Sequence, residues 1–187
     1  RHYYVTFGVL GVSLFLRELL GERSTLKATV GIGHHGGAGR KVGFRLGTSD
    51  IDVLYSVWGR RDYDCVLNRA VKTRDDVTTI LDAGAYVGYS ALYFADRFPK
   101  ATIFAVEPEP GNFALLMHNV ADCPRIVPIQ AAIWKRSGVT AVCDRGTGPW
   151  GYAVSELVKG KPLVAKDVPS VTIDEIIQRY CLDRINL

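Results

Sequence analysis

The sequence predicts an α/β fold in which helices flank a parallel sheet. From Thr78 onward, three short apolar runs alternate with two stretches of helical spacing. The order strand, helix, strand, helix, strand is typical of βαβ units, which build parallel sheets with right-handed crossovers.

The three runs expected to form strands are Thr78–Asp82, Ala101–Glu107 and Ile126–Ile133. The connecting helices are expected over Gly88–Phe98 and Pro110–Ala121, the second opened by a proline in its first turn. The residues predicted to face inward are Ala91, Leu92, Ala95 and Phe98 in the first helix, and Phe113, Leu116, Met117 and Val120 in the second.

Before the alternating region, two β-like runs, Leu26–Val30 and Lys41–Leu46, flank the glycine-rich stretch Gly31–Gly39, which reads as a hairpin connection. The preceding run Tyr3–Leu16 is uncharged but shorter than the roughly 20 residues that span a bilayer. It is interpreted either as a buried terminal helix or strand, or as the remnant of a signal segment or membrane anchor. We expect residues 1–45 to form an N-terminal apolar segment with this hairpin-like region, and residues 46–187 to form the ligand-binding domain.

A helix is predicted after Gly47–Asp50, because apolar residues recur with helical spacing at Ile51, Leu54, Tyr55 and Trp58. Oxygens of Ser49 or Asp50 are expected to cap its first turn.

Beyond Trp134, short strands are expected over Val139–Cys143 and Tyr152–Val158, around the turn Gly146–Pro149. Thr172 and Glu175 fit a capping box that opens a helix through Tyr180. Arg184–Leu187 is predicted to begin a fourth strand, and the strands that complete the sheet are expected beyond it.

Composition excludes several classes of protein. The 187 residues are 48% hydrophobic and 22% charged, which is typical of a soluble globular domain. The net charge of +4 comes from scattered residues, so no nucleic-acid partner is predicted, and membrane association is not expected. The four cysteines are widely spaced and form no metal-ligand cluster, which favours reduced thiols in a cytoplasmic protein that binds no metal.

The chemically informative stretch is Asp82–Gly88, which reads DAGAYVG. It follows a predicted strand and opens a predicted helix, so it lies at the carboxyl end of the sheet, where open α/β folds bind ligands. Gly84 allows a sharp turn and close approach to a ligand, and Gly88 allows close packing of helix and strand. Glu107 ends the next strand and can accept hydrogen bonds from both ribose hydroxyls of an adenosine cofactor.

The charge of this loop favours S-adenosylmethionine (SAM) over a dinucleotide. A dinucleotide site uses G-x-G-x-x-G, with backbone N–H groups free to meet a pyrophosphate. Here Asp82 occupies the position of the first glycine, and its carboxylate would repel a pyrophosphate but attract the ammonium and sulfonium of SAM.

The segment ILDAGAYVGYSALYFADRFPKATIFAVEPEPGNFALLMHN resembles the core of the FkbM family of methyltransferases, which reads close to ILDAGANIG…FAVEPxPxNF. GTSDIDV, AAIW and VPSVTIDEIIQRYCLDRINL extend the resemblance over Leu46–Leu187. The resemblance implies a class I methyltransferase (Rossmann-like) fold, SAM as cofactor, and methyl transfer to a hydroxyl of a sugar or a natural-product-type small molecule.

The resemblance also implies roles for individual positions. Tyr86 stands where the family usually has Asn, and Trp134 has plain core packing as its alternative role. An acidic segment resembling LKIDIEGAE is expected to follow Arg184–Leu187. The implied cofactor-binding residues are Asp82, Gly84, Ala85, Tyr86 and Gly88 in the SAM loop, Glu107 on the ribose, Pro108 with Glu109 in the next turn, and Ala132 with Trp134 at the adenine edge.

Methyl transfer to a hydroxyl requires a group that removes its proton, and the sequence offers His34 and Asp50 as candidates without identifying a catalytic residue. Two other functions stay open. One is an NAD(P)-dependent oxidoreductase, disfavoured because G-x-G-x-x-G is absent. The other is a SAM-binding module without catalytic activity.

Overall fold

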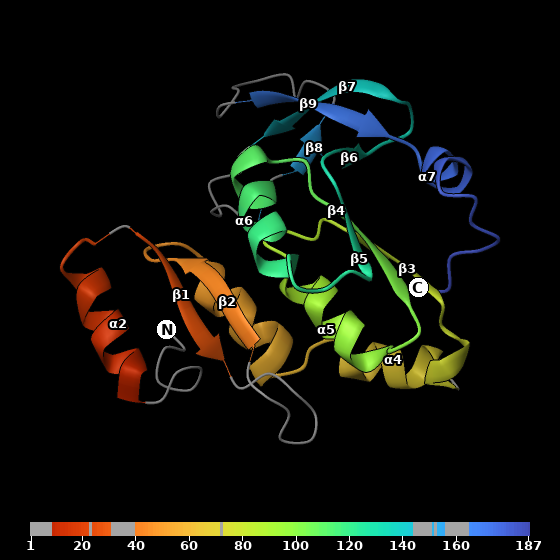
Figure 1. The fold of residues 1–187 in the computed structure, drawn as a ribbon. Helices are drawn as coiled ribbons and strands as arrows, with labels where there is room; N and C mark the ends of the chain where they lie inside the picture. Colours follow the sequence, from red (N-terminus) through yellow and green to blue (C-terminus); the bar gives the residue numbers. More distant parts are fainter. Residues whose placement is uncertain are drawn as a thin grey trace. The chain divides into compact units, whose positions relative to one another are not determined.

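The chain has two compact units, Arg1–Lys72 and Thr73–Leu187, in a computed structural model (Figure 1). The structure describes residues 9–22, 24–30, 40–71, 73–143, 151, 153–155 and 165–187. Within these described ranges, none of the helices has the length and apolar character that crossing a membrane requires.

The first unit contains the expected hairpin. Strands β1 (Thr25–Val30) and β2 (Arg40–Arg45) pair antiparallel, with Thr25 opposite Arg45. The glycine-rich stretch between them lies outside the described residues. Ahead of the hairpin, helix α2 (Val9–Leu19) covers most of the uncharged run, so this part of the run is helical.

Helix α2 buries only one face. Leu14 packs in an apolar cluster with Phe44, Leu46 and Ile51, whereas Leu16 and the other large apolar residues toward the end of the helix are exposed. The cluster joins α2 and β2 to helix α3 (Asp50–Leu54). This packing continues past residue 45, and the division of the chain into domains at that residue stays a prediction.

After α3 the backbone widens into the π-helical turn η1 (Tyr55–Gly59), and helix α4 (Asp64–Ala70) follows. The apolar spacing therefore predicted helical backbone correctly but not the change of helix type.

The second unit confirms the predicted parallel sheet. After the short 3₁₀ helix η2 (Arg74–Asp76), strands β3 (Thr79–Ala83), β4 (Thr102–Val106) and β5 (Ile126–Ile129) pair in the order β3-β4-β5. This is the core of a Rossmann-like sheet.

Residues at the end of the chain lie beside β3, as Figure 1 shows. The Leu81 N–H donates to the carbonyl of Leu187 (2.8 Å), and the Asn186 N–H donates to the carbonyl of Thr79 (2.9 Å). These groups of β3 point away from β4, because alternate residues of a strand bond to opposite neighbours. Arg184–Leu187 is not a regular strand, but its backbone begins to pair where the fourth strand was predicted.

Both faces of the sheet are covered. Helix α5 (Tyr89–Arg97) packs on all three strands, and helix α6 (Pro110–Val120) packs on β5 and α5. On the opposite face, Phe104 and Val106 pack against Ile176 of helix α7 (Ile173–Arg179). Continuous burial on both faces is typical of parallel sheets.

The first turns of two of these helices are capped by side chains. The Glu109 carboxylate accepts from the Asn112 N–H (2.7 Å), and Pro110 occupies the first turn of α6. The Thr172 hydroxyl accepts from the Glu175 N–H (3.1 Å), which confirms the predicted start of α7.

The inward face of α6 differs from the prediction. Leu116 and Val120 are buried as expected, but Met117 is 47% exposed and Phe113 is only half-buried. The face is rotated toward two asparagines, and its buried members are Asn112, Leu115, Leu116, Asn119 and Val120. In α5 the predicted residues Ala91, Leu92 and Ala95 are buried, as is Phe98 just after the helix.

The predicted third strand, Ile126–Ile133, is in fact two strands in different sheets. The Ala131 N–H bonds to the carbonyl of Ile129 (3.1 Å), and this tight turn ends β5. Strand β6 (Ala132–Ile133) then pairs parallel with β9 (Ala165–Val171).

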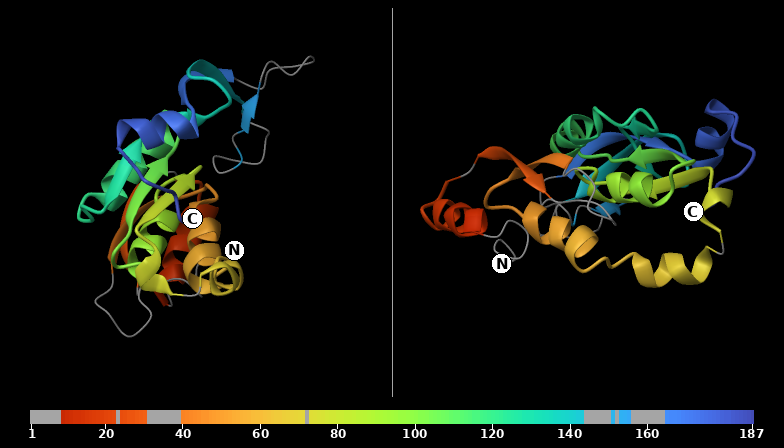
Figure 2. Two further views of the ribbon diagram at one scale, coloured as in Figure 1. Left: turned by 90° about the vertical axis from the view of Figure 1, so that its right-hand side faces the viewer. Right: turned by 60° about the horizontal axis from the view of Figure 1, so that its bottom comes forward.

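This second sheet has the order β6-β9-β7-β8, with β7 (Gly138–Cys143) antiparallel to both β9 and β8 (Ala153–Ser155). The left view of Figure 2 shows it beyond the end of the three-stranded sheet. The predicted strand Val139–Cys143 is therefore present as part of β7. Of the predicted strand Tyr152–Val158, residues 153–155 are described, and they form β8. The turn at 146–149 lies outside the described residues.

Candidate functional site

The glycine loop connects β3 to α5 at the carboxyl end of the sheet, as predicted. Gly84 (φ 83°) and Gly88 (φ 87°) both adopt left-handed backbone conformations, which glycine accepts without strain. The N–H groups of Gly84 and Ala85 donate to the carbonyl of Val106 on β4 (2.8 and 2.9 Å), and the Gly88 N–H donates to the carbonyl of Ala85 (2.8 Å). The loop is thus folded against β4 by its own backbone donors.

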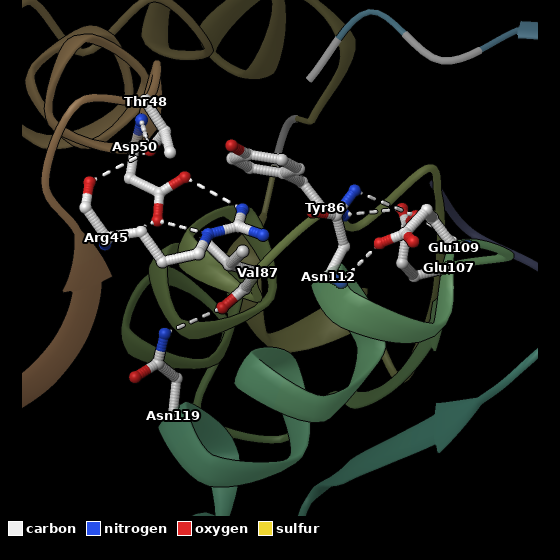
Figure 3. Close-up of polar contacts among 9 residues, drawn as sticks. All are labelled: Arg45, Thr48, Asp50, Tyr86, Val87, Glu107, Glu109, Asn112 and Asn119. Carbon is white, nitrogen blue, oxygen red and sulfur yellow. Dashed lines mark hydrogen bonds and ion pairs between the residues drawn. The ribbon is translucent and has the colours of Figure 1, made fainter. Parts of the chain in front are cut away.

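Glu107 ties this loop to the next turn. Its side chain lies directly after β4, and the residue is only 5% exposed. One carboxylate oxygen accepts from the Tyr86 N–H (3.0 Å). The other accepts from the Glu109 N–H (3.0 Å) and from the side-chain amide of Asn112 (3.3 Å) (Figure 3).

Burial raises the pKa of Glu107 to about 7, although its hydrogen bonds to Glu109, Asn112 and Tyr86 oppose the shift. The nearby carboxylate of Glu109 raises it further. A bound cation would favour the ionised form of Glu107, since it would offset the cost of keeping a charge out of water.

Asp82 is the second buried acid of the site. Burial raises its pKa to about 6, and a hydrogen bond from the Ser90 hydroxyl (2.7 Å) opposes the shift. Three carboxyl groups, on Asp82, Glu107 and Glu109, therefore lie in or beside the two turns that follow β3 and β4. This arrangement suits a cationic ligand and disfavours a phosphate group.

The two loop glycines have different surroundings. Gly84 is exposed, and a Cβ atom built there would meet nothing within 4 Å, so a ligand can approach its backbone closely. A Cβ on Gly88 would come within 3.1 Å of the Val120 side chain and 3.4 Å of the Leu116 side chain. Gly88 was expected to allow helix–strand packing, but these nearest neighbours belong to α6, so the close contact is between the loop and that helix.

Tyr86 also adopts a left-handed conformation (φ 54°), and the residue is 7% exposed. Asparagine tolerates this conformation better than a bulky aromatic residue. The backbone thus gives a physical reason for the asparagine that the FkbM pattern usually has at this position. Tyr86 meets the same requirement with its backbone N–H held by Glu107.

The remaining predicted cofactor residues lie farther along the chain. Pro108 is half-buried in the turn between β4 and α6, and Ala132 is buried in β6. Trp134 follows β6 and is half-buried, with the Lys135 ammonium 5.9 Å from the centre of its ring. Its backbone N–H bonds to the carbonyl of Val171 (3.0 Å). Contact of these residues with an adenine ring stays a prediction.

Sequence reasoning missed Asn112 and Asn119, which are buried on α6 at 1% and 8% exposure. The Asn112 amide reaches Glu107, and the Asn119 amide donates to the carbonyl of Val87 in the loop (2.9 Å) (Figure 3). Their spacing with Leu116 is helical, so they share its buried face. That spacing was a usable signal, because a polar residue on a buried helix face requires a partner.

Asp50 was nominated both as a helix cap and as a base. Its carboxylate is fully buried and accepts from the Arg45 backbone N–H (2.8 Å) and from the Arg45 guanidinium (3.0 and 2.9 Å) (Figure 3). Ser49 makes no side-chain capping bond, and the Asp50 N–H instead donates to the Thr48 hydroxyl (3.2 Å). Capping by Ser49 or Asp50 was therefore wrong, because a charged donor competes better for the carboxylate.

The hydrogen bonds between Asp50 and Arg45 connect the start of α3 to the end of β2 within the first unit. They do not support a role for Asp50 in removing a proton from a substrate. His34, the other candidate base, lies outside the described residues.

The chain was compared with models of protein families. A family model described as "Methyltransferase FkbM domain" matches residues 82–187, more than half of the chain and the whole of the site around the glycine loop. Among curated proteins, no match is found.

Proposed function

Because this chain belongs to the FkbM methyltransferase family, we propose that it transfers a methyl group from SAM to an oxygen atom of a small molecule. The family match supports methyl transfer in general. The identity of the donor, the oxygen acceptor and the roles of individual residues are the proposed parts.

One observation supports the choice of cofactor: backbone N–H groups of the loop donate hydrogen bonds to other groups of the protein. Gly84 and Ala85 donate to Val106, and Tyr86 donates to Glu107. A pyrophosphate requires such N–H groups to be available, so this loop is poorly suited to NAD(P). The buried acids Asp82 and Glu107 supply the negative charge that a sulfonium and an ammonium group favour.

The proposed contacts follow the chain around the site. Gly84 offers a backbone that a ligand can approach, and Asp82 provides negative charge beneath it. Glu107 accepts one bond from the ribose at the position left beside its three protein bonds, because an ionised carboxylate has about four acceptor positions. Ala132 and Trp134 are proposed to border the adenine.

SAM, when bound, supplies an activated methyl group for in-line displacement by an oxygen nucleophile. The task of this chain is to hold the donor in one orientation, and such alignment can lower a barrier by roughly 7 to 11 kcal/mol. The fixed geometry of the loop, with Tyr86 and Glu107 bonded, suits that task. An acceptor hydroxyl also needs a base near the methyl group.

The acceptor is proposed to be a hydroxyl of a sugar or a natural-product-type molecule, as the family implies. We place the protein in the cytoplasm, because all four cysteines are free thiols, which suits a reducing compartment. The alternative is a SAM-binding module without catalytic activity, and an activity assay would distinguish it from a methyltransferase.

Calorimetry with SAM, S-adenosylhomocysteine and NADH tests the cofactor directly. We expect binding of the first two and none of NADH, and the opposite pattern would refute the proposal. Incubating the protein with labelled SAM and a panel of hydroxylated metabolites tests catalysis, and label transfer to an amine or thiol alone would refute the oxygen acceptor.

The ribose contact has its own test. Wild-type protein should bind a 2′-deoxy analogue of S-adenosylhomocysteine about tenfold or more weakly than the parent compound, since one charge-assisted hydrogen bond is lost. Glu107→Gln should reduce this ratio, whereas Glu109→Gln, a change at the neighbouring buried acid, should preserve it. Equal binding of the two ligands by wild type would remove Glu107 from the ribose.

A further inference from the structure

The glycine loop is held at two successive points by buried polar side chains. Glu107 accepts from the Tyr86 N–H on one side. On the other, the Asn119 amide of α6 donates to the carbonyl of Val87 (2.9 Å). The two bonds fix the peptide groups before Tyr86 and after Val87, so the conformation of both residues is determined from outside the loop (Figure 3).

Such anchoring is needed because the loop contains a strained residue. Tyr86 has φ 54° and is followed after one residue by Gly88 at φ 87°. A bulky residue stays in the left-handed region only where its surroundings impose that conformation. Without the two bonds, residue 86 would be free to relax to an ordinary conformation and redirect the peptide groups around it.

The side-chain amide of Asn119 connects its helix to the loop. The residue is 8% exposed, and its amide reaches a carbonyl 32 residues earlier in the chain. The neighbouring positions Leu116 and Val120 are apolar, so packing alone would be satisfied by another apolar residue. A buried amide at this position is explained by the bond that it makes.

We propose that Asn119 is a positioning residue: by holding the Val87 carbonyl, it keeps the Gly84–Gly88 loop in the conformation that binds the cofactor. Asn119 itself touches no cofactor. The inference rests on the proposed function for its effect on SAM, and on the hydrogen bond to Val87 for its effect on the loop.

The test compares Asn119→Leu with Leu115→Ala, which perturbs another buried residue of the same helix without removing a bond to the loop. Asn119→Leu should weaken SAM and S-adenosylhomocysteine binding about tenfold in calorimetry, since a buried carbonyl loses its partner. Leu115→Ala should change the affinity less than twofold, even if its melting temperature falls as far. Equal losses of affinity in the two variants would show that general destabilisation is responsible.

A second variant tests the mechanism. In a Tyr86→Asn background, residue 86 adopts the left-handed conformation more readily, so the loop depends less on its anchor. Asn119→Leu should then cost clearly less affinity than it does in wild type, a non-additivity that a double-mutant cycle measures. Strictly additive effects would overturn the link between Asn119 and the strained residue.

Amide hydrogen exchange by NMR separates this inference from the proposed function. In unliganded protein, Asn119→Leu should speed exchange at Tyr86 and Gly88 about tenfold relative to Ile103 in β4. Unchanged loop exchange would refute the positioning role whatever the ligand. Faster loop exchange in a protein that binds no SAM would refute the proposed function and leave the positioning of the loop standing.

Discussion

Replacing each loop glycine by alanine separates two costs that the structure assigns to different positions. Gly84 and Gly88 have nearly the same backbone conformation, with φ of 83° and 87°. A Cβ in this region costs about 1 to 2 kcal/mol, and the stiffer unfolded chain of the alanine variant offsets about 0.4 to 1 kcal/mol of that cost. Both variants share this conformational cost.

Only Gly88 has a second cost. Its Cβ would lie 3.1 Å from the Val120 side chain, closer than ordinary carbon–carbon contact, and 3.4 Å from the Leu116 side chain, whereas the Cβ of Gly84→Ala would meet nothing within 4 Å. Overpacking of a well-packed interior costs about 1 to 3 kcal/mol. We therefore expect Gly84→Ala to lose up to about 1.5 kcal/mol of unfolding free energy and Gly88→Ala about 1 to 4.5 kcal/mol.

Denaturant unfolding, followed by far-UV circular dichroism, measures the difference between the two variants. Gly138→Ala is the control, because Gly138 also has positive φ (133°) and open space for a Cβ but lies in β7. It should be destabilised at least as much as Gly84→Ala, because φ near 133° is less accessible to alanine than φ near 83°, and it should leave SAM binding unchanged. Equal destabilisation by Gly84→Ala and Gly88→Ala would refute the packing argument, and unchanged SAM affinity in Gly84→Ala and Gly84→Val would argue against ligand contact at Gly84.

Two further predictions concern buried polar groups. The pKa of Glu107 is raised from 4.5 to about 7, so the native state retains its proton to higher pH than the unfolded chain, and the free energy of unfolding should fall as pH rises from about 4.5 to 7. Denaturant titrations of unliganded protein between pH 4 and 8 measure this fall, and Glu107→Gln should make it shallower. The smaller contribution of Asp82 should remain at the lower end of the range. An unchanged dependence of stability on pH in Glu107→Gln would contradict the raised pKa of Glu107. The Arg125 guanidinium donates to the carbonyls of Ala95, Phe98 and Ala101 around the end of α5, so Arg125→Met should cost about 2 to 3 kcal/mol of stability. Arg125→Lys, which retains a charged donor, should cost less, and equal losses would show that the stem of the side chain matters more than its hydrogen bonds.

The sequence determined the central fold because its signals there are local and mutually consistent. Short apolar runs, helical spacing and the glycine-rich turn at Asp82–Gly88 all predicted βαβ units. Each end of β3, α5, β4 and α6 lies within one residue of its predicted position. The position of the loop at the carboxyl end of the sheet followed from this order alone. Thr172 and Glu175 predicted the start of α7 for the same reason, since a capping box is a local motif.

Other features depended on contacts between residues distant in sequence. The break between β5 and β6 could not be read from the continuous apolar run Ile126–Ile133, because β6 is defined by pairing with β9. Asp50, by contrast, looked like a cap although its partner Arg45 is only five residues earlier, because a capping pattern contains no information on the residue that ends β2.

The same distinction applies to the site. Residue types and spacing predicted Asp82, Gly84 and Glu107 as site residues, because each lies at or just after the end of a strand that is visible in the sequence. Only the tertiary structure decided that Glu107 holds the Tyr86 backbone and that Asn119 holds the carbonyl of Val87. The physical reason is that a hydrogen bond between buried groups depends on the rotation of α6 about its own axis, and helical periodicity placed that face toward Met117 instead of Asn119.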